Sequence, residues 1–206
     1  MSTLLHLDSS PLETSISREL AREFVKTWKT AHPTGTVIYR DLAANPPKPL
    51  DTAWIYAAFT PADARIPEQK AALAQSDELI AELQKADEYV ISAAMHNFTI
   101  PSTLKLWIDQ VVRVGQTFSY GAQGPEGLLK GKKVTILTAS GGVYAEGTPA
   151  AAANFIDPYL KTILGFIGLT DLKIVSAGGA SQIMQGKIDR EAFIKPNLER
   201  VRAAVA

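Results

Sequence analysis

The chain has 206 residues, of which 46% are apolar, a composition typical of a globular protein and not of a disordered one. Its 21 Lys and Arg balance 21 Asp and Glu, so the formal net charge is +0 and neither nucleic acid nor an anionic membrane is an expected partner. Cysteine is absent, which excludes disulfides, thiolate metal sites and Cys nucleophiles. We expect no signal peptide and no membrane span, and therefore a cytoplasmic protein.

The predicted elements alternate between strands and helices along the chain. Apolar runs of strand length are separated by stretches in which apolar residues recur at helical spacing, as Leu20, Phe24 and Trp28 do. A proline-rich segment at residues 43–63 and a glycine-rich segment at residues 117–127 are expected to be excursions from this pattern. In chain order the predicted elements are strand 3–7, helix 17–31, strand 36–42, helix 68–85, strand 89–94, helix 102–114, strand 133–138, helix 155–166, strand 172–177 and helix 189–205.

This alternation, without a linker or a repeat, predicts one α/β domain over residues 1–206. Right-handed crossovers would place helices on both faces of a parallel sheet, giving a three-layer sandwich. The simplest such topology is a five-stranded sheet in the order 2-1-3-4-5. Ligands bind such sheets at the carboxyl ends of the strands, so the loops after the first, third and fourth strands form the candidate site.

The loop after the first strand, residues 8–15, has serine hydroxyls just ahead of an amphipathic helix. Hydroxyls and free amides at a helix N-terminus bind phosphate well, which makes Ser10, Ser15 and Ser17 candidate ligands. No Lys or Arg precedes Ser17, so neutral donors would hold the anion. The alternative is that Ser15 or Ser17 only caps the helix. A GxxxxGK[ST] loop and a GxGxxG fingerprint are both absent, which disfavours a nucleoside triphosphate and a dinucleotide of the usual Rossmann type.

The loop after the third strand, residues 95–98 with the sequence Met-His-Asn-Phe, offers backbone amides, a carboxamide and aromatic surface. These groups suit a flat heterocycle with hydrogen-bonding edges. His96 together with His6 and His32 gives no metal-ligand spacing, so we expect no metal. We interpret His96 as a packing or stacking residue that adjusts substrate fit, and not as a catalytic base.

The loop after the fourth strand, residues 139–142 with the sequence Ala-Ser-Gly-Gly, allows the backbone to come close to a ligand because glycine has no side chain. The alternative is a tight strand-to-helix turn without a ligand. Ser140 is not the nucleophile of a GxSxG elbow, because Thr138 stands two residues before it. Acyl transfer is therefore disfavoured.

Several segments, in order along most of the chain, resemble the FMN-dependent NADH:quinone oxidoreductases known as azoreductases. They include the N-terminal Asp-Ser-Ser-Pro and Ser-Ile-Ser motifs, RDLAANP, SDELIAELQKAD, MHNFTIPSTLKLWID, GPEGLLKGKK, the SGG loop and PYLKTILGFIGLTD. The resemblance implies a flavodoxin-like fold, a homodimer with its active site at the subunit interface, and one non-covalent FMN per subunit. It also implies a ping-pong reaction in which NADH or NADPH donates hydride and a quinone or azo compound is reduced.

The same resemblance implies which residues contact FMN. The serine loop would hold the phosphate, the Met-His-Asn-Phe loop would lie along the isoalloxazine ring, and the Ala-Ser-Gly-Gly loop would close the other edge. The family often has Tyr at His96, Ser at Ala139 and Arg at Ser140, so these differences bear on substrate and donor preference. The residues assigned to FMN are Ser10, Ser15, Ile16, Ser17, Met95, His96, Asn97, Phe98, Ala139, Ser140, Gly141 and Gly142.

The two excursions are expected to wall the open face of the flavin, contributed by the second subunit, with Phe59, Phe118 and Tyr120 as the substrate-pocket residues. An alternative function is a flavodoxin-like FMN electron carrier without a small-molecule substrate of its own. Such carriers are typically small and acidic, whereas this chain is neutral and has long excursions, which favours an enzyme. A non-flavin binding module that reuses the fold is the third possibility, because fold alone does not fix function.

Overall fold

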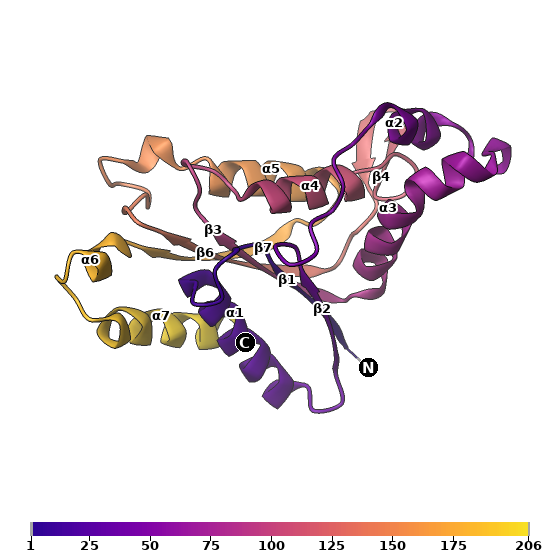
Figure 1. The fold of residues 1–206 in the computed structure, drawn as a ribbon. Coiled ribbons are helices and arrows are strands. Elements are labelled where there is room, and N and C mark those ends of the chain that lie inside the picture. The colour runs from indigo at the N-terminus through magenta and orange to yellow at the C-terminus, as the bar shows by residue number, and fades with distance from the viewer. Residues whose placement is uncertain (1, 206) are drawn as a thin grey trace.

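A five-stranded parallel sheet forms the centre of the molecule (Figure 1). The computed structural model describes residues 2–205. The strand order is β2-β1-β3-β6-β7, which is 2-1-3-4-5 when only the strands of this sheet are counted, so the predicted topology is confirmed. The strands are β1 (Thr3–Asp8), β2 (Thr36–Asp41), β3 (Glu88–Ala94), β6 (Lys133–Ser140) and β7 (Asp171–Gly178).

Helices cover both faces of this sheet and bury two hydrophobic clusters against it (Figure 1). Helices α3, α4 and α5 pack on one face, and α1 and α7 pack on the other. Each predicted helix is present, with boundaries shifted by up to three residues. The helices are α1 (Ile16–Ala31), α3 (Pro67–Lys85), α4 (Ser102–Val111), α5 (Ile156–Phe166) and α7 (Arg190–Ala204).

The central strands are buried on both faces because their side chains alternate between the two clusters. In β1, Leu5 and Leu7 belong to the cluster under α3, α4 and α5, whereas Leu4 belongs to the cluster under α1 and α7. In β3, Ile91 belongs to the cluster under α3, α4 and α5, and Val90 belongs to the cluster under α1 and α7. This burial makes the register of the central strands strict, since a slip of one residue would exchange the two faces.

The proline-rich segment contains a helix that the sequence did not predict, α2 (Thr52–Phe59). Asp51 caps it by accepting a hydrogen bond from the amide of Trp54 at 2.8 Å. The Trp54 indole donates to the Gln110 side chain at 2.9 Å, and Gln110 donates to the Lys48 carbonyl at 2.8 Å. The segment is therefore fixed to the C-terminal end of α4.

The glycine-rich segment folds into an antiparallel hairpin of β4 (Phe118–Gly121) and β5 (Gly124–Gly127). Helix α4 ends at Val111, three residues before the predicted end at residue 114. The Thr117 hydroxyl explains the early end, because it donates to the Val111 carbonyl at 2.7 Å and accepts from the Arg113 amide at 3.1 Å.

The remaining short elements lie in the connections of the C-terminal half and in the proline-rich segment. They are α6 (Ser181–Met184) and the 3-10 turns Ala62–Ala64 and Ala151–Ala153. Over residues 2–205, every helix is too short or too polar to cross a membrane.

The hairpin packs against the end of α5 at a backbone contact that requires glycine. A Cβ at Gly127 would lie 2.1 Å from the amide nitrogen of Gly168, so the backbone would have to move. We expect Gly127→Ala to lower the free energy of unfolding by about 1–3 kcal/mol, measured by urea denaturation. Gly121→Ala is the matched control in the same hairpin, because its nearest contact would be an ordinary 3.7 Å. Equal stability of the two variants would contradict this packing.

Candidate flavin site

The three loops singled out in the sequence leave the same edge of the sheet. Strands β1, β3 and β6 are neighbours, with Asp8 paired to Ser92 and Ala94 paired to Ala139 in the ladder. Because the strands are parallel, their carboxyl ends lie side by side. The candidate site therefore sits where open α/β sheets bind their ligands.

The N-terminus of α1 has free backbone donors. Ser15 is the N-cap residue, but its hydroxyl makes no capping hydrogen bond and instead lies 3.0 Å from the Ser17 hydroxyl. The capping alternative is therefore not what the structure shows. The first-turn amides of α1, which have no partner within a helix, stay available along with the buried hydroxyls of Ser10, Ser15 and Ser17. Uncapped amides and hydroxyls together suit a phosphate group.

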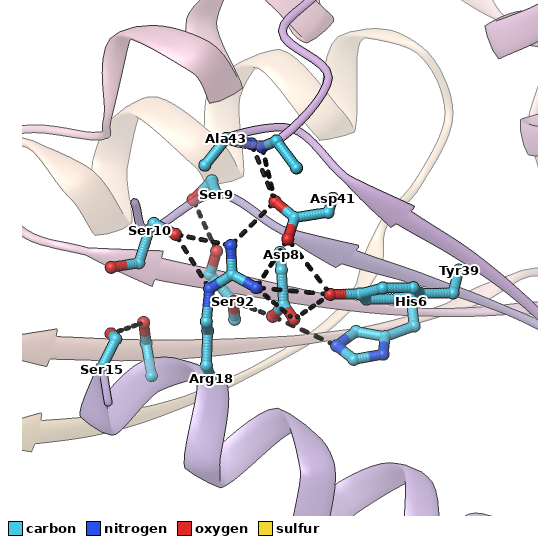
Figure 2. A network of polar contacts seen from close by, with 12 residues as sticks. His6, Asp8, Ser9, Ser10, Ser15, Arg18, Tyr39, Asp41, Ala43 and Ser92 are labelled. Carbon is cyan, nitrogen blue, oxygen red and sulfur yellow. Dashed lines mark hydrogen bonds and ion pairs between the residues drawn. The ribbon is translucent and has the colours of Figure 1, made fainter. Parts of the chain in front are cut away.

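A polar network centred on Arg18 holds this serine loop through the carbonyl of Ser10 (Figure 2). Arg18 is 7% exposed, and its Nε and Nη2 donate to the Ser10 carbonyl at 2.8 and 2.7 Å. Its Nη1 and Nη2 also donate to the two Asp41 carboxylate oxygens, each at 2.8 Å. Asp8 lies 3.5 Å from Arg18 Nη1, and the Tyr39 hydroxyl donates to Asp8 at 3.0 Å.

The charges of this network shift the pKa values of its members. The hydrogen bond from Arg18 is the main reason that the pKa of Asp41 falls from 3.8 to about 2. Burial raises the pKa of Asp8, but contacts with His6 and Ser92 and the charge of Arg18 outweigh burial and leave the pKa below its usual value. Burial and the neighbouring carboxylates raise the pKa of Tyr39 to about 12. At neutral pH both carboxylates are ionised and the phenol is neutral.

The loop after β3 is a tight turn from His96 to Thr99. The His96 amide donates to the Thr99 carbonyl at 2.9 Å, and the Thr99 amide donates back at 3.0 Å. Both central residues have positive φ, 47° for Asn97 and 71° for Phe98, as a type I′ turn requires. This conformation is strained for residues other than glycine, and such strain is concentrated at functional sites.

That turn presents unpaired donors at the edge of the sheet. Within residues 2–205, neither the backbone amides of Asn97 and Phe98 nor the Asn97 carboxamide has a hydrogen-bond partner. The Phe98 carbonyl accepts from the Phe155 amide at 3.1 Å, and the Phe98 ring packs edge-on against Tyr144 at 6.1 Å. The turn is therefore fixed by its neighbours while its polar groups face outward.

The loop after β6 is the third loop at the carboxyl edge of the sheet. The Ala139 carbonyl accepts from the Met95 amide at 2.8 Å, which joins this loop to the turn after β3. The Ser140 hydroxyl donates to the Gly142 carbonyl at 2.8 Å, so it is held within its own loop. Gly141 is exposed, and a Cβ there would meet only the Ser181 side chain at 3.8 Å. The carbonyls of Ser140, Gly141 and Gly142 accept hydrogen bonds from the amides of residues 179–181, so it is the amides of Gly141 and Gly142 that this loop could offer to a ligand.

Comparison with known proteins identifies the family. A model of the flavodoxin-like fold matches residues 2–204. The FMN-dependent NADH:quinone oxidoreductase of Acidobacterium capsulatum is 61% identical over 206 residues, which is 100% of both chains. This chain belongs to the family of FMN-dependent NADH:quinone oxidoreductases and azoreductases. The FMN-dependent NADH:quinone oxidoreductase 3 of Burkholderia lata is 43% identical over 207 residues and 100% of both chains.

Solved azoreductase structures share the whole fold. The azoreductase of Bacillus anthracis str. Sterne superposes with a TM-score of 0.87 at 31% identity, covering 100% of this chain and 99% of that one. An FMN-dependent NADH-azoreductase of Bacillus anthracis str. Ames Ancestor, solved in complex with FMN, gives a TM-score of 0.87 at 25% identity and covers 100% and 98% of the two chains.

The donors of this chain fit the FMN of that family. FMN needs anion donors for its phosphate and hydrogen-bond donors along the polar edge of its ring. The uncapped start of α1 could supply the first, and the unpaired groups of Asn97 and Phe98 could supply the second. The Thr103 hydroxyl at the start of α4 donates to the Ser9 carbonyl at 3.1 Å. This bond links the serine loop to the helix that follows the turn at Asn97 and Phe98, and so fixes the distance between the phosphate donors and the ring donors.

Two cavities lie next to the turn after β3. Met95 lines a cavity of about 530 Å³ together with Tyr144 and its neighbours in the segment after β6. His96 and Asn97 line another cavity of about 490 Å³, together with Lys105 and Tyr159. His96 is exposed and its backbone closes the turn, so its side chain is free to contact a ligand.

The three expected substrate-pocket residues lie away from these loops in the same chain. Phe59 ends α2 and Tyr120 lies in β4, and both elements are at the C-terminal end of α4, whereas the turn after β3 leads into its N-terminal end (Figure 1). Phe59 is 74% exposed and Tyr120 is 72% exposed. Phe118 is buried, with its ring 4.6 Å from the ring of Phe166.

Sequence reasoning missed the residues that support the loops. Arg18 directly follows the Ser-Ile-Ser motif, and Asp41 lies in the RDLAANP segment, but no spacing rule relates two residues from a helix and a neighbouring strand. Tyr144 was also missed, although it lies two residues beyond Gly142. For Arg18 the available signal was its position directly after the Ser-Ile-Ser motif, a candidate phosphate site.

The Asp41–Arg18 pair predicts a specific acid dependence of stability. The pKa of Asp41 is about 2 in the folded protein, below its ordinary 3.8, so the pair stabilises the fold above about pH 4 and loses this contribution as the pH falls toward 2. We expect the free energy of unfolding of the wild type to fall more steeply from about pH 4 to pH 2 than that of Asp41→Asn. Urea denaturation at each pH measures both, and parallel curves would contradict the pairing.

Proposed function

We propose that residues 1–206 form one FMN-binding domain that acts as an FMN-dependent oxidoreductase, taking hydride from NADH or NADPH and reducing quinones and azo compounds. The observation that supports this most is the set of unpaired donors along one sheet edge, in a chain 61% identical to an FMN-dependent NADH:quinone oxidoreductase. We place this activity in the cytoplasm, where the nicotinamide donor is available.

The proposed chemistry divides between cofactor and protein. FMN, when bound, would supply the two-electron transfer between the nicotinamide and the acceptor. With a quinone as acceptor, quinone, NADH and one proton would give hydroquinone and NAD⁺. The protein binds the phosphate at the start of α1 and orients the ring with Asn97 and Phe98. No side chain of the site is needed as an acid or a base for the hydride transfer itself.

Donor and acceptor would use the same open face in turn, as a ping-pong reaction requires. The exposed groups around the turn after β3, His96 and the Phe98 ring among them, lie beside the proposed ring position. Their contacts would set the fit of the acceptor. The substitution of Tyr by His at position 96 is therefore proposed to alter substrate preference and not the cofactor.

We also propose a homodimer whose second subunit completes each site. Exposed aromatic residues lie at both ends of α4, with Phe98 and Phe155 near its start and Phe59 and Tyr120 near its end. A helix of 10 residues spans about 15 Å, so the two groups are apart within one chain. A two-fold pairing across α4 would bring each group against the other and cover both.

Flavin binding and reduction test the proposed enzyme. We expect the purified protein to bind one FMN per chain after reconstitution, and the yellow absorption to bleach when NADH or NADPH is added without oxygen. Addition of a quinone should then restore the colour. Protein that binds FMN but does not bleach with either nicotinamide would indicate an electron carrier, and protein that binds no FMN at micromolar concentration would contradict the proposal.

If the second subunit completes each site, a variant that loses the dimer should also lose quinone reduction. Phe59→Ser should shift light scattering from dimer toward monomer and lower quinone reduction more than about tenfold, while FMN binding persists because its donors lie on other loops. Met184→Ser is the control, because Met184 is 91% exposed on α6, outside the proposed interface. A Phe59→Ser monomer with full activity would refute the shared site.

A further inference from the structure

Arg18 lies next to the serine loop, but its guanidinium is engaged entirely by the protein. A guanidinium has five N–H groups. Nε and one hydrogen of Nη2 point to the Ser10 carbonyl, the second hydrogen of Nη2 and one of Nη1 point to Asp41, and Nη1 also approaches the Tyr39 hydroxyl at 3.3 Å. No N–H remains to contact a ligand. A direct phosphate contact is therefore excluded as the role of Arg18 in this arrangement.

The charge of Arg18 is also balanced inside the network. Asp41 pairs with it at 2.8 Å and Asp8 lies 3.5 Å away, so two carboxylates face one guanidinium. Asp8 is itself fixed by the Ser92 hydroxyl, which donates at 2.5 Å, and by His6 at 3.2 Å. The site gains no net positive charge from this group. Arg18 instead keeps the buried Asp8 and the half-buried Asp41 carboxylates from facing a dianion unpaired.

The bonds from Arg18 join the two ends of the serine loop. Ser10 lies near the exit from β1, and Arg18 lies in the first turn of α1, eight residues later. The paired N–H groups hold the Ser10 carbonyl toward the Arg18 side chain (Figure 2). Pro11 follows, and its ring limits the rotation of the same backbone. The position of the Ser10 hydroxyl relative to the helix amides is fixed as a result.

We propose that Arg18 is a positioning residue for the phosphate of the flavin. It holds the serine loop in the shape that aims the Ser10 hydroxyl and the α1 amides at one point, and Asp41 and Asp8 hold Arg18 in turn. This inference rests on the proposed function, because it takes the serine loop as the phosphate site. It predicts an effect on the phosphate alone, since the ring contacts lie on the turn after β3.

The test compares two ligands that differ only in the phosphate. Dissociation constants for FMN and riboflavin are measured by quenching of flavin fluorescence on the flavin-free protein, for wild type, Arg18→Met, Arg18→Lys and Arg22→Met. We expect Arg18→Met to weaken FMN binding about tenfold to a hundredfold, since the Ser10 carbonyl and two carboxylates lose their partner. Riboflavin binding should change less than about threefold.

Two further variants test whether the paired N–H groups of Arg18, and not only its charge, are required. Arg18→Lys keeps the charge but cannot give two parallel N–H bonds to one carbonyl, so the ratio of FMN to riboflavin affinity should fall to an intermediate value. Arg22 is exposed on the next turn of α1, and Arg22→Met should leave the ratio unchanged. Thermal unfolding of each variant without flavin shows whether it is folded.

The outcomes separate this inference from the proposed function. A wild type that binds neither ligand would contradict the proposed function itself. A wild type that prefers FMN, with an unchanged preference in folded Arg18→Met, would overturn the role of Arg18, and so would an equal loss of both ligands. If Arg18→Met does not fold, an Arg18→Lys protein with the wild-type ratio would overturn it.

Discussion

The adjacency of β1, β3 and β6 in the middle of the sheet is the constraint on which the rest of the site depends. Their carboxyl ends, at Asp8, Ala94 and Ser140, are kept in line by the parallel ladder. Both faces of these strands are buried, so the ladder cannot slip without exchanging its two hydrophobic clusters. Loops distant in the sequence therefore lie at fixed distances from one another. The hydrogen bonds within and between the loops then fix the positions of individual polar groups.

The site is built largely from backbone donors that the fold leaves unpaired. At the start of α1 the N-cap Ser15 turns its hydroxyl to Ser17 and not to a first-turn amide. At Asn97 and Phe98 a strained turn aims two more amides outward. Both arrangements cost stability in the absence of a ligand, because uncapped helices and positive φ at non-glycine residues are unfavourable. A ligand that pairs these groups would recover that cost on binding.

The charged groups near the serine loop hold the loop in place, whereas the groups proposed to contact the ligand are neutral. The chain is neutral overall, and the serine loop, residues 8–15, contains no Lys or Arg of its own. The nearby guanidinium of Arg18 is balanced by Asp41 and Asp8, behind the loop. Neutral dipoles would thus contact the anion directly, and the pair of Arg18 and Asp41 would keep those dipoles in place. The expectation from the sequence that neutral donors hold the anion stays a prediction.

The sequence by itself determined the order of the five sheet strands and of the five helices that cover them, the parallel topology and the position of the three loops, because hydrophobic period and turn composition are local signals. It did not reveal α2, whose cap at Asp51 is local but whose stability comes from the distant Gln110. It also missed Arg18 and Asp41, which no spacing in the chain relates. Only the tertiary structure decided that the cap of α1 stays open, that His96 closes a turn and that Phe59 and Tyr120 lie far from it. These features depend on contacts between residues remote in sequence, and those contacts exist only once the sheet has brought the strands together.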